Sequence, residues 1–300
     1  SRRFDTLQST MAGGERILDL LNTEVEVRDA ENAHEMGPII GAVRFENVSF
    51  HYSDDGNVRP STAPSKSDGS AQDDNLILNQ IDLDVDAGET VAFVGETGAG
   101  KTTIVKLLTR FHDPTEGCVR VDGVDLRTVT QQSLRRQMGM VLQDPFLFNG
   151  SVKENILFGR LNASDEDVIS AAKAVGAHDF IIGLRNGYDT SVEEGGVLLS
   201  VGQRQLISFA RALLADPRIL ILDEATSSVD IQTEQIIQAA LAKLLKGRTS
   251  FVIAHRLSTI TNADRIVVIH DGQIIEQGRH SELLAKQGMY YELYKTGFQE

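Results

Sequence analysis

The chain has 300 residues and a mass of 32.8 kDa, enough for one large domain or two modest ones. Its 29 Lys and Arg residues against 43 Asp and Glu residues give a net charge of −14, which argues against coating nucleic acid through a cationic face. The single cysteine, Cys118, cannot form an intrachain disulfide and suits a reducing compartment. No run of about 18 apolar residues and no signal-peptide pattern is present, so a soluble chain is expected.

The first forty residues are predicted to be a helix followed by a linker. Apolar or small residues recur every three or four positions, at Phe4, Leu7, Met11, Gly14, Leu18 and Leu21. This spacing predicts a helix with one narrow apolar seam, which packs either on its own domain or on a region upstream. The chain begins with Ser1 rather than Met, which suggests that such an upstream region exists. Residues 24–37 are charged and aperiodic, so a linker is expected there.

Two kinds of strand pattern follow. Residues 43–52 alternate apolar and polar side chains, which predicts short strands of an antiparallel sheet. After Gly88, short continuous apolar runs predict strands covered on both faces, hence a mainly parallel sheet with helices on either side. These runs are residues 91–94, 140–142, 219–222 and 251–254. The pairs Asp122-Gly123 and Asp271-Gly272 predict tight hairpin turns.

Two further segments have neither strand pattern. Residues 53–75 contain five Ser and five Asp but no aromatic residue, so they bury too little apolar surface to offset ordering entropy, and a flexible loop is expected. Residues from about 150 to 215 have helical periodicity, which predicts a helical insertion within the α/β domain.

One loop carries a phosphate-binding pattern. The run Gly95-Glu96-Thr97-Gly98-Ala99-Gly100-Lys101-Thr102 fits G-x-x-x-x-G-K-[ST] and lies between an apolar run and a helical pattern that starts at Thr103. Its glycines let successive backbone N–H groups face phosphate oxygens, beside the positive end of the new helix. Lys101 is predicted to contact the β- and γ-phosphates, and the Thr102 hydroxyl to contact Mg²⁺. Residues 95–103 are therefore predicted to bind the nucleotide.

An acidic element at the end of the apolar run 219–222 fits the same site. Asp223 and Glu224 are adjacent, and adjacent strand residues point to opposite sides, so the two carboxylates are expected to have different roles. Asp223 is predicted to hold the metal through water, and Glu224 to face the γ-phosphate as the general base. The predicted fold is α/β, a RecA-like P-loop NTPase core with an N-terminal antiparallel β-subdomain and an inserted α-helical subdomain.

A five-residue element narrows this class. Leu199-Ser200-Val201-Gly202-Gln203 lies before a helical pattern and upstream of Asp223, and it resembles the signature motif of ABC ATPases. Over residues 41–295 the chain resembles the nucleotide-binding domain of ABC exporters. The resemblance implies a helical subdomain at about residues 144–210 and a C-terminal tail at 296–300. It also implies that residues 1–40 connect to a transmembrane domain upstream of Ser1.

Further residues match this family in the expected order. Tyr52 matches the aromatic that stacks on adenine, Gln143 the glutamine that contacts Mg²⁺ and the attacking water, and His255 the switch histidine that contacts the γ-phosphate. Ser227-Ser228-Val229-Asp230 matches the D-loop. The implied catalytic residues are Glu224, His255, Lys101 and Gln143. The implied metal ligands are Thr102, Gln143 and Asp223.

Two segments resemble the exporter branch of the family, and two residues depart from its pattern. Residues 144–156 resemble the segment that contacts transmembrane coupling helices, and residues 190–196, with Glu194, resemble the exporter X-loop. Val201 replaces the first glycine of the signature, which is costly if φ is positive there and tolerable if φ is ordinary. Glu193 stands where the X-loop usually has Gly.

The resemblance implies an ATP-hydrolysing motor that drives substrate export. Two copies would pack head to tail around two Mg-ATP, with the signature residues 199–203 of one copy completing the ATP site of the other. The implied cofactors are ATP and Mg²⁺, and the implied partners are a second nucleotide-binding domain and a transmembrane domain fused upstream. No nucleic-acid partner is expected. Membrane contact would occur through the transmembrane domain alone, at the cytoplasmic face of the inner membrane.

Three other functions use a similar loop. A free-standing ATPase subunit of an ABC importer is one, although Ser1 and residues 151–156 favour an exporter. A nonmembrane ABC ATPase of DNA repair or translation is another, although such proteins carry long coiled-coil insertions or basic linkers and this chain is acidic. A kinase or GTPase is the third, and the motif at 199–203 argues against it.

Overall fold

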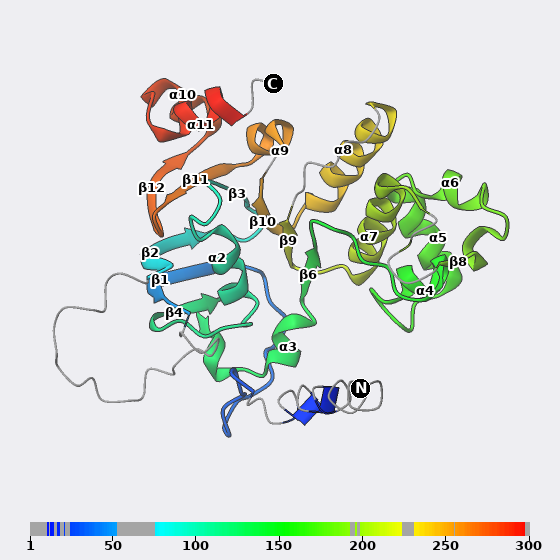
Figure 1. Cartoon of the computed structure of the whole chain (residues 1–300), viewed down its shortest axis with the longest axis horizontal. Helices are drawn as coiled ribbons and strands as arrows, with labels where there is room; N and C mark the ends of the chain where they lie inside the picture. Colours follow the sequence, from blue (N-terminus) through cyan, green and yellow to red (C-terminus); the bar gives the residue numbers. More distant parts are fainter. Residues whose placement is uncertain are drawn as a thin grey trace, which may run out of the picture.

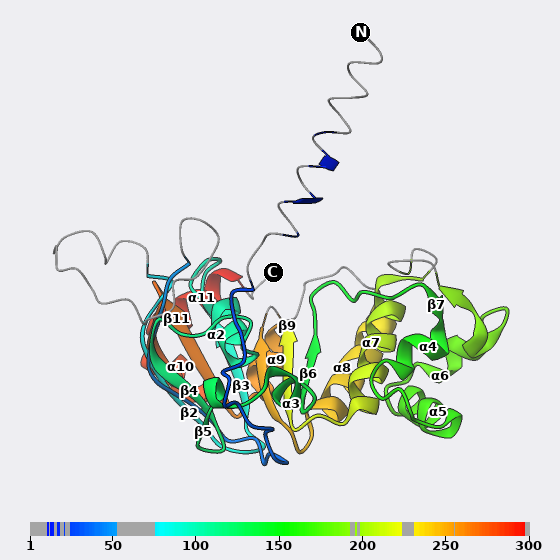
Figure 2. The ribbon, with the colours of Figure 1, turned by 90° about the horizontal axis from the view of Figure 1, so that it is seen from below.

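The structure of the chain is a computed structural model, which describes residues 11, 13–14, 17–18, 21, 25–52, 76–192, 196, 199–223, 231–254 and 256–297. Within these residues, an antiparallel sheet and a helical subdomain lie at opposite sides of the molecule, with a mainly parallel sheet between them (Figures 1 and 2). The predicted α/β class, with its N-terminal β-subdomain and inserted helical subdomain, is confirmed.

The antiparallel sheet consists of β1 (Val43–Phe50), β2 (Leu78–Val85), β4 (Glu116–Val121) and β5 (Val124–Asp125), in the order β2-β1-β4-β5. Its alternating pattern arises because successive side chains point to opposite faces, and the apolar face is buried. Asp122 and Gly123 join β4 to β5 with φ of 49° and 79°. Two consecutive positive φ values are those of a tight hairpin turn, so this predicted turn is confirmed.

The second sheet has six strands in the order β12-β11-β3-β10-β9-β6. Its strands are β3 (Thr90–Val94), β6 (Met138–Val141), β9 (Ile219–Asp223), β10 (Thr249–Ile253), β11 (Arg265–His270) and β12 (Gln273–Gly278). All neighbours pair in parallel except β11 and β12, which form the second predicted hairpin at Asp271-Gly272. The continuous apolar runs are thus confirmed as central strands of a mainly parallel sheet.

Alternate side chains of these strands enter two separate cores. One core joins the sheet to α2 (Lys101–Leu108) and to the antiparallel sheet, and includes Val91, Phe93, Ile221, Phe251 and Ile253. The other joins it to helices on the opposite face, and includes Ala92, Val94, Leu222, Val252 and Ala254. Burial on both faces explains why the sequence has apolar runs here instead of an alternating pattern. Because β3 and α2 are both buried in the first core, the loop that joins them is anchored at both ends.

Four helices at the carboxyl end of the chain pack into the second core. They are α8 (Ile231–Leu245), α9 (Leu257–Asn262), α10 (His280–Lys286) and α11 (Met289–Gly297). Each contributes apolar side chains to this core, with Leu241, Ile260, Leu283 and Tyr290 as examples. Because α11 continues to Gly297, the predicted tail at 296–300 begins inside a helix, and residues 298–300 lie outside the described part.

The helical subdomain contains α4 (Val152–Leu157), α5 (Asp165–Ala174), α6 (His178–Ile182) and α7 (Val201–Ala215). The subdomain also contains the 3₁₀ turn η2 (Gly187–Asp189) and two short strands, β7 (Gly150–Ser151) and β8 (Ser191–Val192), which pair with each other. Serine residues start α4, α5 and α7 with a reciprocal capping box. Because α7 continues to Ala215, the subdomain extends beyond the predicted limit near residue 210.

Residues 26–42, which we call the N-terminal strap, run along η1 (Leu126–Thr128), α3 (Gln131–Arg135) and the β4–β5 hairpin (Figure 1). The Met36 N–H donates to Ser133 Oγ at 2.9 Å. The Asp122 carboxylate accepts the N–H groups of residues 40–42. A linker was expected here, whereas the structure docks the segment on the domain. Backbone groups make these contacts, so they leave no side-chain period in the sequence.

Upstream of the strap, the described residues between 11 and 21 are helical, in keeping with the predicted seam. Met11, Leu18 and Leu21 are 59%, 58% and 74% exposed. Phe4 and Leu7 of the seam and the predicted loop at 53–75 lie outside the described residues. Among the residues described, no helix combines the length and the apolar character needed to cross a membrane.

Candidate nucleotide site

The predicted phosphate-binding loop connects the end of β3 to the start of α2. Lys101, the first residue of α2, is 8% exposed, and its Nζ donates to the carbonyl oxygens of Gly95 and Glu96, both at 2.7 Å. Burial lowers the pKa of Lys101, while the nearby negative charge of Asp223 acts in the opposite direction. The ammonium group is therefore partly desolvated, held by its own loop, and within electrostatic reach of the acidic end of β9.

Two glycines of the loop have no room for a side chain. Gly100 has a φ of 106°, and a Cβ there would lie 2.6 Å from Leu78 Cδ2 and 3.0 Å from the Ile77 carbonyl oxygen. A Cβ on Gly95 would lie 2.2 Å from the Ile269 carbonyl oxygen. The positive φ and the close backbone contacts are the features that require glycine at these points of a phosphate-binding loop.

The order of the strands brings the predicted metal ligands to the same side of the sheet, the edge formed by the carboxyl ends of its parallel strands. β10 lies between β3 and β9, and its Ile253 pairs with Phe93 on one side and with Asp223 on the other. β6 adjoins β9, so Gln143, which follows β6, lies at this edge one strand farther from the loop. Carboxyl ends of parallel strands meet at one edge, where ligands of such sheets bind. The hydroxyl-bearing Thr102 is exposed at the start of α2.

Several predicted site residues lie outside the described part of the chain. They are Glu224, Asp230, His255 and the X-loop residues Glu193 and Glu194. Glu224 follows Asp223 directly in the sequence, and His255 comes two residues after the end of β10. Their catalytic and contact roles remain predictions from sequence.

Tyr52, predicted to stack on adenine, lies two residues beyond β1 and next to α2. Its hydroxyl is 3.4 Å from Thr103 Oγ1 and accepts a hydrogen bond from Lys106 Nζ at 3.3 Å. The Lys106 ammonium also lies 5.3 Å from the centroid of the Tyr52 ring. Phe50 and His112 contact the same ring in T-shaped geometry, with centroid distances of 4.9 Å and 5.3 Å. The predicted adenine platform is thus held on the helix that follows the phosphate loop.

These neighbours of Tyr52 could not be predicted from the sequence alone. His112 is 60 positions from Tyr52, and Lys106 occupies an ordinary helix position. A contact prediction from homologous sequences is the signal that could have found them, because a single sequence does not record which distant residues touch.

The signature residues lie in a different part of the molecule from the loop. Ser200 caps α7: its Oγ accepts from the Gln203 N–H at 3.2 Å, and Gln203 Oε1 accepts from the Ser200 N–H at 3.0 Å. Val201 is the first residue of α7, and its φ is not positive. The β-branched side chain therefore fits without backbone strain. α7 packs on α4, α5 and α8, on the far side of β9 and β6 from α2 (Figure 1).

An exposed aromatic cluster occupies the surface of the helical subdomain. Phe146, Phe148 and Phe158 are 43%, 44% and 49% exposed. The ring of Phe148 contacts the rings of both Phe146 and Phe158. The Arg211 guanidinium lies 5.5 Å from the Phe148 ring centroid and donates to the Asn155 carbonyl oxygen at 2.8 Å. Phe146 and Phe148 belong to the predicted coupling segment, whereas Phe158 and Arg211 were not predicted from the sequence.

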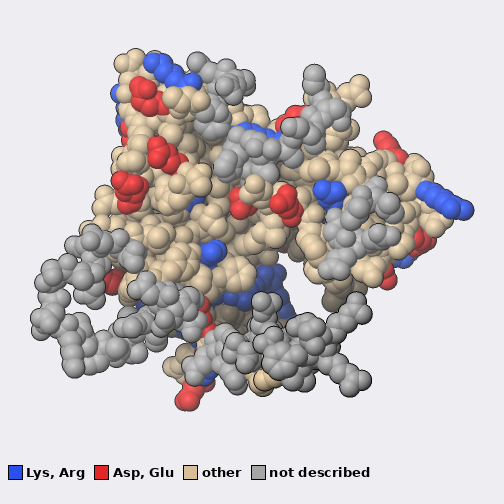
Figure 3. All heavy atoms as spheres, viewed as in Figure 1, with Lys and Arg blue, Asp and Glu red and all other residues tan. Residues whose placement is uncertain are grey.

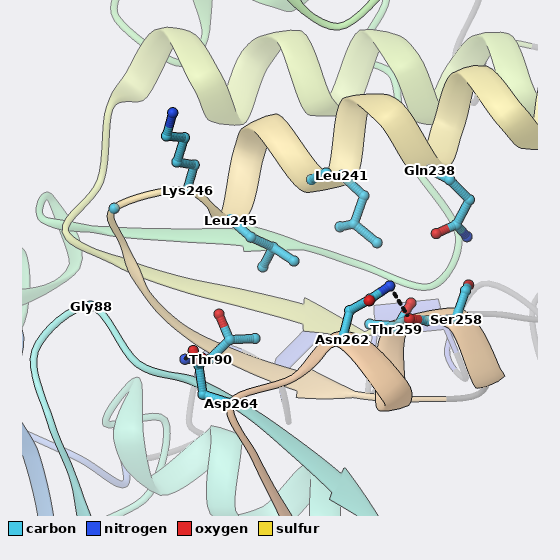
Figure 4. A pocket seen from close by; sticks show the side chains of 12 residues that line it. Gly88, Thr90, Gln238, Leu241, Leu245, Lys246, Ser258, Thr259, Asn262 and Asp264 are labelled. Atoms are coloured by element: carbon cyan, nitrogen blue, oxygen red, sulfur yellow. Dashed lines mark hydrogen bonds between the residues drawn. The ribbon is translucent and has the colours of Figure 1, made fainter. Parts of the chain in front are cut away.

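A separate cavity of about 520 Å³ lies at the amino ends of the parallel strands, between α8 and α9 (Figure 4). Leu241 and Leu245 of α8 form its apolar side, opposite Asn262 of α9. Thr90 and Asp264 close it at the strand ends, where the Thr90 N–H donates to Asp264 Oδ2 at 2.9 Å. None of the described residues predicted to bind nucleotide lines this cavity, so it is distinct from the nucleotide site.

Charged side chains of both signs are distributed in small groups over the face seen in Figure 3, among larger uncharged areas. Ion pairs elsewhere in the described chain join Arg265 to Glu89 and Arg248 to Asp216. The phosphate-binding loop holds its own positive charge, the partly desolvated Lys101 ammonium.

A glycine-dependent loop between β3 and α2, with an acidic residue at the end of β9 on a mainly parallel sheet, defines the P-loop NTPase class. The family model described as "ABC transporter" matches residues 78–227. The chain belongs to the ABC transporter family, and its resemblance to the nucleotide-binding domain of exporters is confirmed by the relatives that follow.

Three curated relatives illustrate the likeness. The chain is 47% identical over 300 residues to an uncharacterized ABC transporter ATP-binding protein, YfiC, of Bacillus subtilis, covering 100% of this chain and 46% of the relative. It is 46% identical over 296 residues to an ATP-dependent lipid A-core flippase of Syntrophus aciditrophicus, covering 99% and 46%. It is 46% identical over 289 residues to a putative multidrug export ATP-binding/permease protein, YgaD, of Bacillus subtilis, covering 96% and 47%.

The chain is also similar to a solved structure of an ABC exporter. The chain aligns with the structure of a bacterial Atm1-family ABC exporter with ATP bound at a TM-score of 0.82 and 40% identity. The alignment covers 99% of this chain and 49% of that one. The chain thus spans a little under half the length of the curated relatives and of the structure that it matches.

Proposed function

We propose that this chain is the ATP-binding and ATP-hydrolysing motor domain of an exporter, and that it dimerises head to tail around two Mg-ATP to drive substrate export across a membrane. The observation that carries the proposal is the position of Lys101, which is buried in the Gly95–Thr102 loop at the sheet edge where β9 ends in Asp223. The similarity to a lipid flippase, a putative multidrug export protein and a solved exporter favours this function over an importer subunit or a nonmembrane ATPase.

The loop and Lys101 would hold the phosphates of ATP. The Lys101 Nζ lies 2.7 Å from two loop carbonyl oxygens, and it would exchange these acceptors for oxygens of the β- and γ-phosphates. Because burial lowers the pKa of Lys101, an anionic ligand that favours the charged ammonium would offset the desolvation. Residues 96–98 of the loop are exposed and would add backbone N–H groups.

The predicted metal ligands fit Mg²⁺ in their chemistry and in their place at one edge of the sheet. Thr102, Gln143 and Asp223 provide a hydroxyl, an amide oxygen and a carboxylate, and oxygen is the ligand atom that Mg²⁺ prefers. Bound Mg²⁺ would neutralise charge on the β- and γ-phosphates. Asp223 would hold it through water, and the exposed Thr102 hydroxyl would contact it directly.

Three residues that lie just beyond strand ends would complete the reaction. Glu224, as general base, would accept the proton of the water that attacks the γ-phosphate. His255 would contact the γ-phosphate with its imidazole, and Gln143 would contact the attacking water. These roles come from the family match and from the sequence positions next to β9 and β10.

A second copy of the domain would complete each ATP site. Residues 199–203 lie at the start of α7, where N–H groups at the helix end favour an anion. Ser200, the N-cap of α7, is exposed, so this helix end is available to a partner's nucleotide, and α7 lies on the far side of β9 and β6 from α2 (Figure 1). Asp230 of the D-loop would lie in the same interface. The ordinary φ of Val201 supports a competent signature despite the missing glycine.

A transmembrane domain would dock on the aromatic cluster of the helical subdomain. Phe146, Phe148 and Phe158 form a contiguous exposed apolar surface, which commonly marks an interaction site. The exposed seam at Met11, Leu18 and Leu21 supports a connection upstream. The domain would then work at the cytoplasmic face of the inner membrane, in contact with the membrane through its transmembrane partner.

Steady-state ATP hydrolysis by the chain and its Glu224→Gln variant tests this function. We expect Glu224→Gln to lower kcat by about 10²- to 10⁴-fold, because the variant loses the general base and keeps the ligands of the phosphates. Glu166→Gln, an exposed position in the first turn of α5, is the matched control and is expected to hydrolyse ATP at the parent rate. Hydrolysis that persists in Glu224→Gln would overturn the assignment of the base.

A further inference from the structure

The N-terminal strap reaches the turn that follows α2, close to Tyr52. Glu26 Oε1 lies 2.8 Å from His112 Nδ1, and the two side chains are 21% and 16% exposed. His112 lies four residues beyond the end of α2, the helix that begins with Lys101. A carboxylate at the start of the strap is thus in direct contact with a residue attached to the P-loop helix.

His112 is at the same time part of an aromatic cluster with Tyr52. Its ring centroid is 5.3 Å from that of Tyr52 at 85°, and 5.4 Å from that of Phe50 at 39°. Phe50 is fully buried and contacts Tyr52 at 4.9 Å. The three rings form a closed triangle, so a displacement of His112 removes one of two aromatic supports of Tyr52.

A second contact fixes the strap to the same turn. Arg110 is 2% exposed, and its Nη1 donates to Asp29 Oδ1 of the strap at 3.2 Å. Its Nη2 donates to the Arg28 carbonyl oxygen at 3.3 Å, and its Nε to Asp113 Oδ1 at 3.1 Å. The Glu26–His112 contact is therefore held at a defined position by a buried arginine two residues earlier in the turn.

We propose that Glu26 and His112 are positioning residues for Tyr52, and that the N-terminal strap thereby sets the affinity of the site for the adenine part of ATP. The inference rests on the proposed role of Tyr52 in binding ATP. Lys106 and Thr103 hold the Tyr52 hydroxyl, whereas His112 and Phe50 hold its ring. A change at the strap would be transmitted through Glu26 to His112 and then to the ring of Tyr52. It would leave the phosphate loop unchanged.

Equilibrium binding of Mg-ATP and of Mg-tripolyphosphate to the 300-residue chain, measured by titration calorimetry, separates these effects. Tripolyphosphate fills the phosphate loop and has no base to stack. We expect His112→Ala to weaken ATP binding by about three- to tenfold, the range for loss of an aromatic pair, with unchanged tripolyphosphate affinity. Glu26→Gln is expected to weaken ATP binding by about twofold to threefold in the same selective way, because it retains packing but loses the charge.

Three controls make each result decisive. Glu35→Gln changes an exposed strap carboxylate that makes no ion pair within the described part of the chain, and it is expected to bind both ligands like the parent. His112→Phe keeps a ring against Tyr52 and is expected to recover most of the affinity lost in His112→Ala. Tyr52→Ala tests the proposed function itself.

The outcomes distinguish the two proposals. If Tyr52→Ala binds ATP as the parent does, the adenine role of Tyr52 is wrong. If Tyr52→Ala weakens ATP binding while His112→Ala and Glu26→Gln do not, the role of the strap is wrong and that of Tyr52 stands. A parallel loss of ATP and tripolyphosphate affinity in His112→Ala would assign His112 a general structural role and would overturn the inference.

Discussion

The two ends of the proposed nucleotide site are built in different ways. At the phosphate end, one continuous segment from Gly95 to Thr102 provides the loop, and its conformation depends on glycines and backbone contacts. At the adenine end, Tyr52 is held by side chains from α2, from the turn after it and, through His112, from the N-terminal strap. The functional groups of the first end thus come from one continuous segment, whereas those that hold Tyr52 at the second end come from several segments. Affinity for the base is then the adjustable part of the site.

Replacing Lys101 is expected to have the largest effect, and it should affect both ligands. Lys101→Ala removes a charged donor from the phosphates, a contribution of about 1.5–3 kcal/mol, so affinity should fall roughly 10- to 100-fold for Mg-ATP and for Mg-tripolyphosphate alike. Titration calorimetry with the two ligands measures this. An exposed lysine, Lys286→Ala at the end of α10, is the matched control. If Lys101→Ala weakened the binding of ATP alone, the assignment of Lys101 to the phosphates would be contradicted.

Replacing Tyr52 should give the opposite pattern. Base stacking on an aromatic ring contributes about 1–3 kcal/mol, so Tyr52→Ala should weaken ATP binding roughly tenfold and leave tripolyphosphate binding unchanged. Tyr52→Phe keeps the ring and loses only the contacts of the hydroxyl with Thr103 and Lys106, so it should bind ATP within about threefold of the parent. If Tyr52→Ala and the parent bind ATP with equal affinity, Tyr52 does not contribute to binding of the adenine base.

Alanine substitutions at two glycines of the phosphate loop, with Gly37 of the strap as control, test how much each glycine contributes to stability. Gly100→Ala combines a positive φ with a clash against Leu78 and should destabilise the fold by about 2 kcal/mol or more. Gly98→Ala has a φ of 89° and open space, so about 1–2 kcal/mol of backbone strain is expected. Gly37→Ala, with open space and no positive φ, should be neutral. Chemical unfolding measures the series, and equal stability of all three variants would contradict a strained loop.

The phosphate end could be predicted from sequence because its chemistry is contiguous. The loop at 95–102, the strand end at Asp223 and both Asp-Gly hairpins are short patterns whose geometry depends on neighbouring residues. The parallel sheet was also predictable, since burial on both faces produces apolar runs.

The contacts of Tyr52 and of the strap were harder to predict from the sequence. Tyr52 was predicted through family resemblance, but its support by His112 joins residues far apart in the chain. The strap was expected to be a linker because its contacts leave no periodic pattern. Backbone N–H groups of the strap bind Ser133 and Asp122, and its Glu26 and Asp29 side chains contact residues about 80 positions farther along the chain. Whether Val201 strains the signature was undecided from sequence, because φ depends on where α7 begins.

The most direct test of the proposed motor is the mass of the Glu224→Gln chain in solution, measured by multi-angle light scattering with and without Mg-ATP. We expect one chain of 32.8 kDa without nucleotide and twice that mass with saturating Mg-ATP, because each ATP would join the loop of one copy to the α7 N-terminus of the other. A mass of one chain in the presence of bound ATP, at high protein concentration, would contradict it.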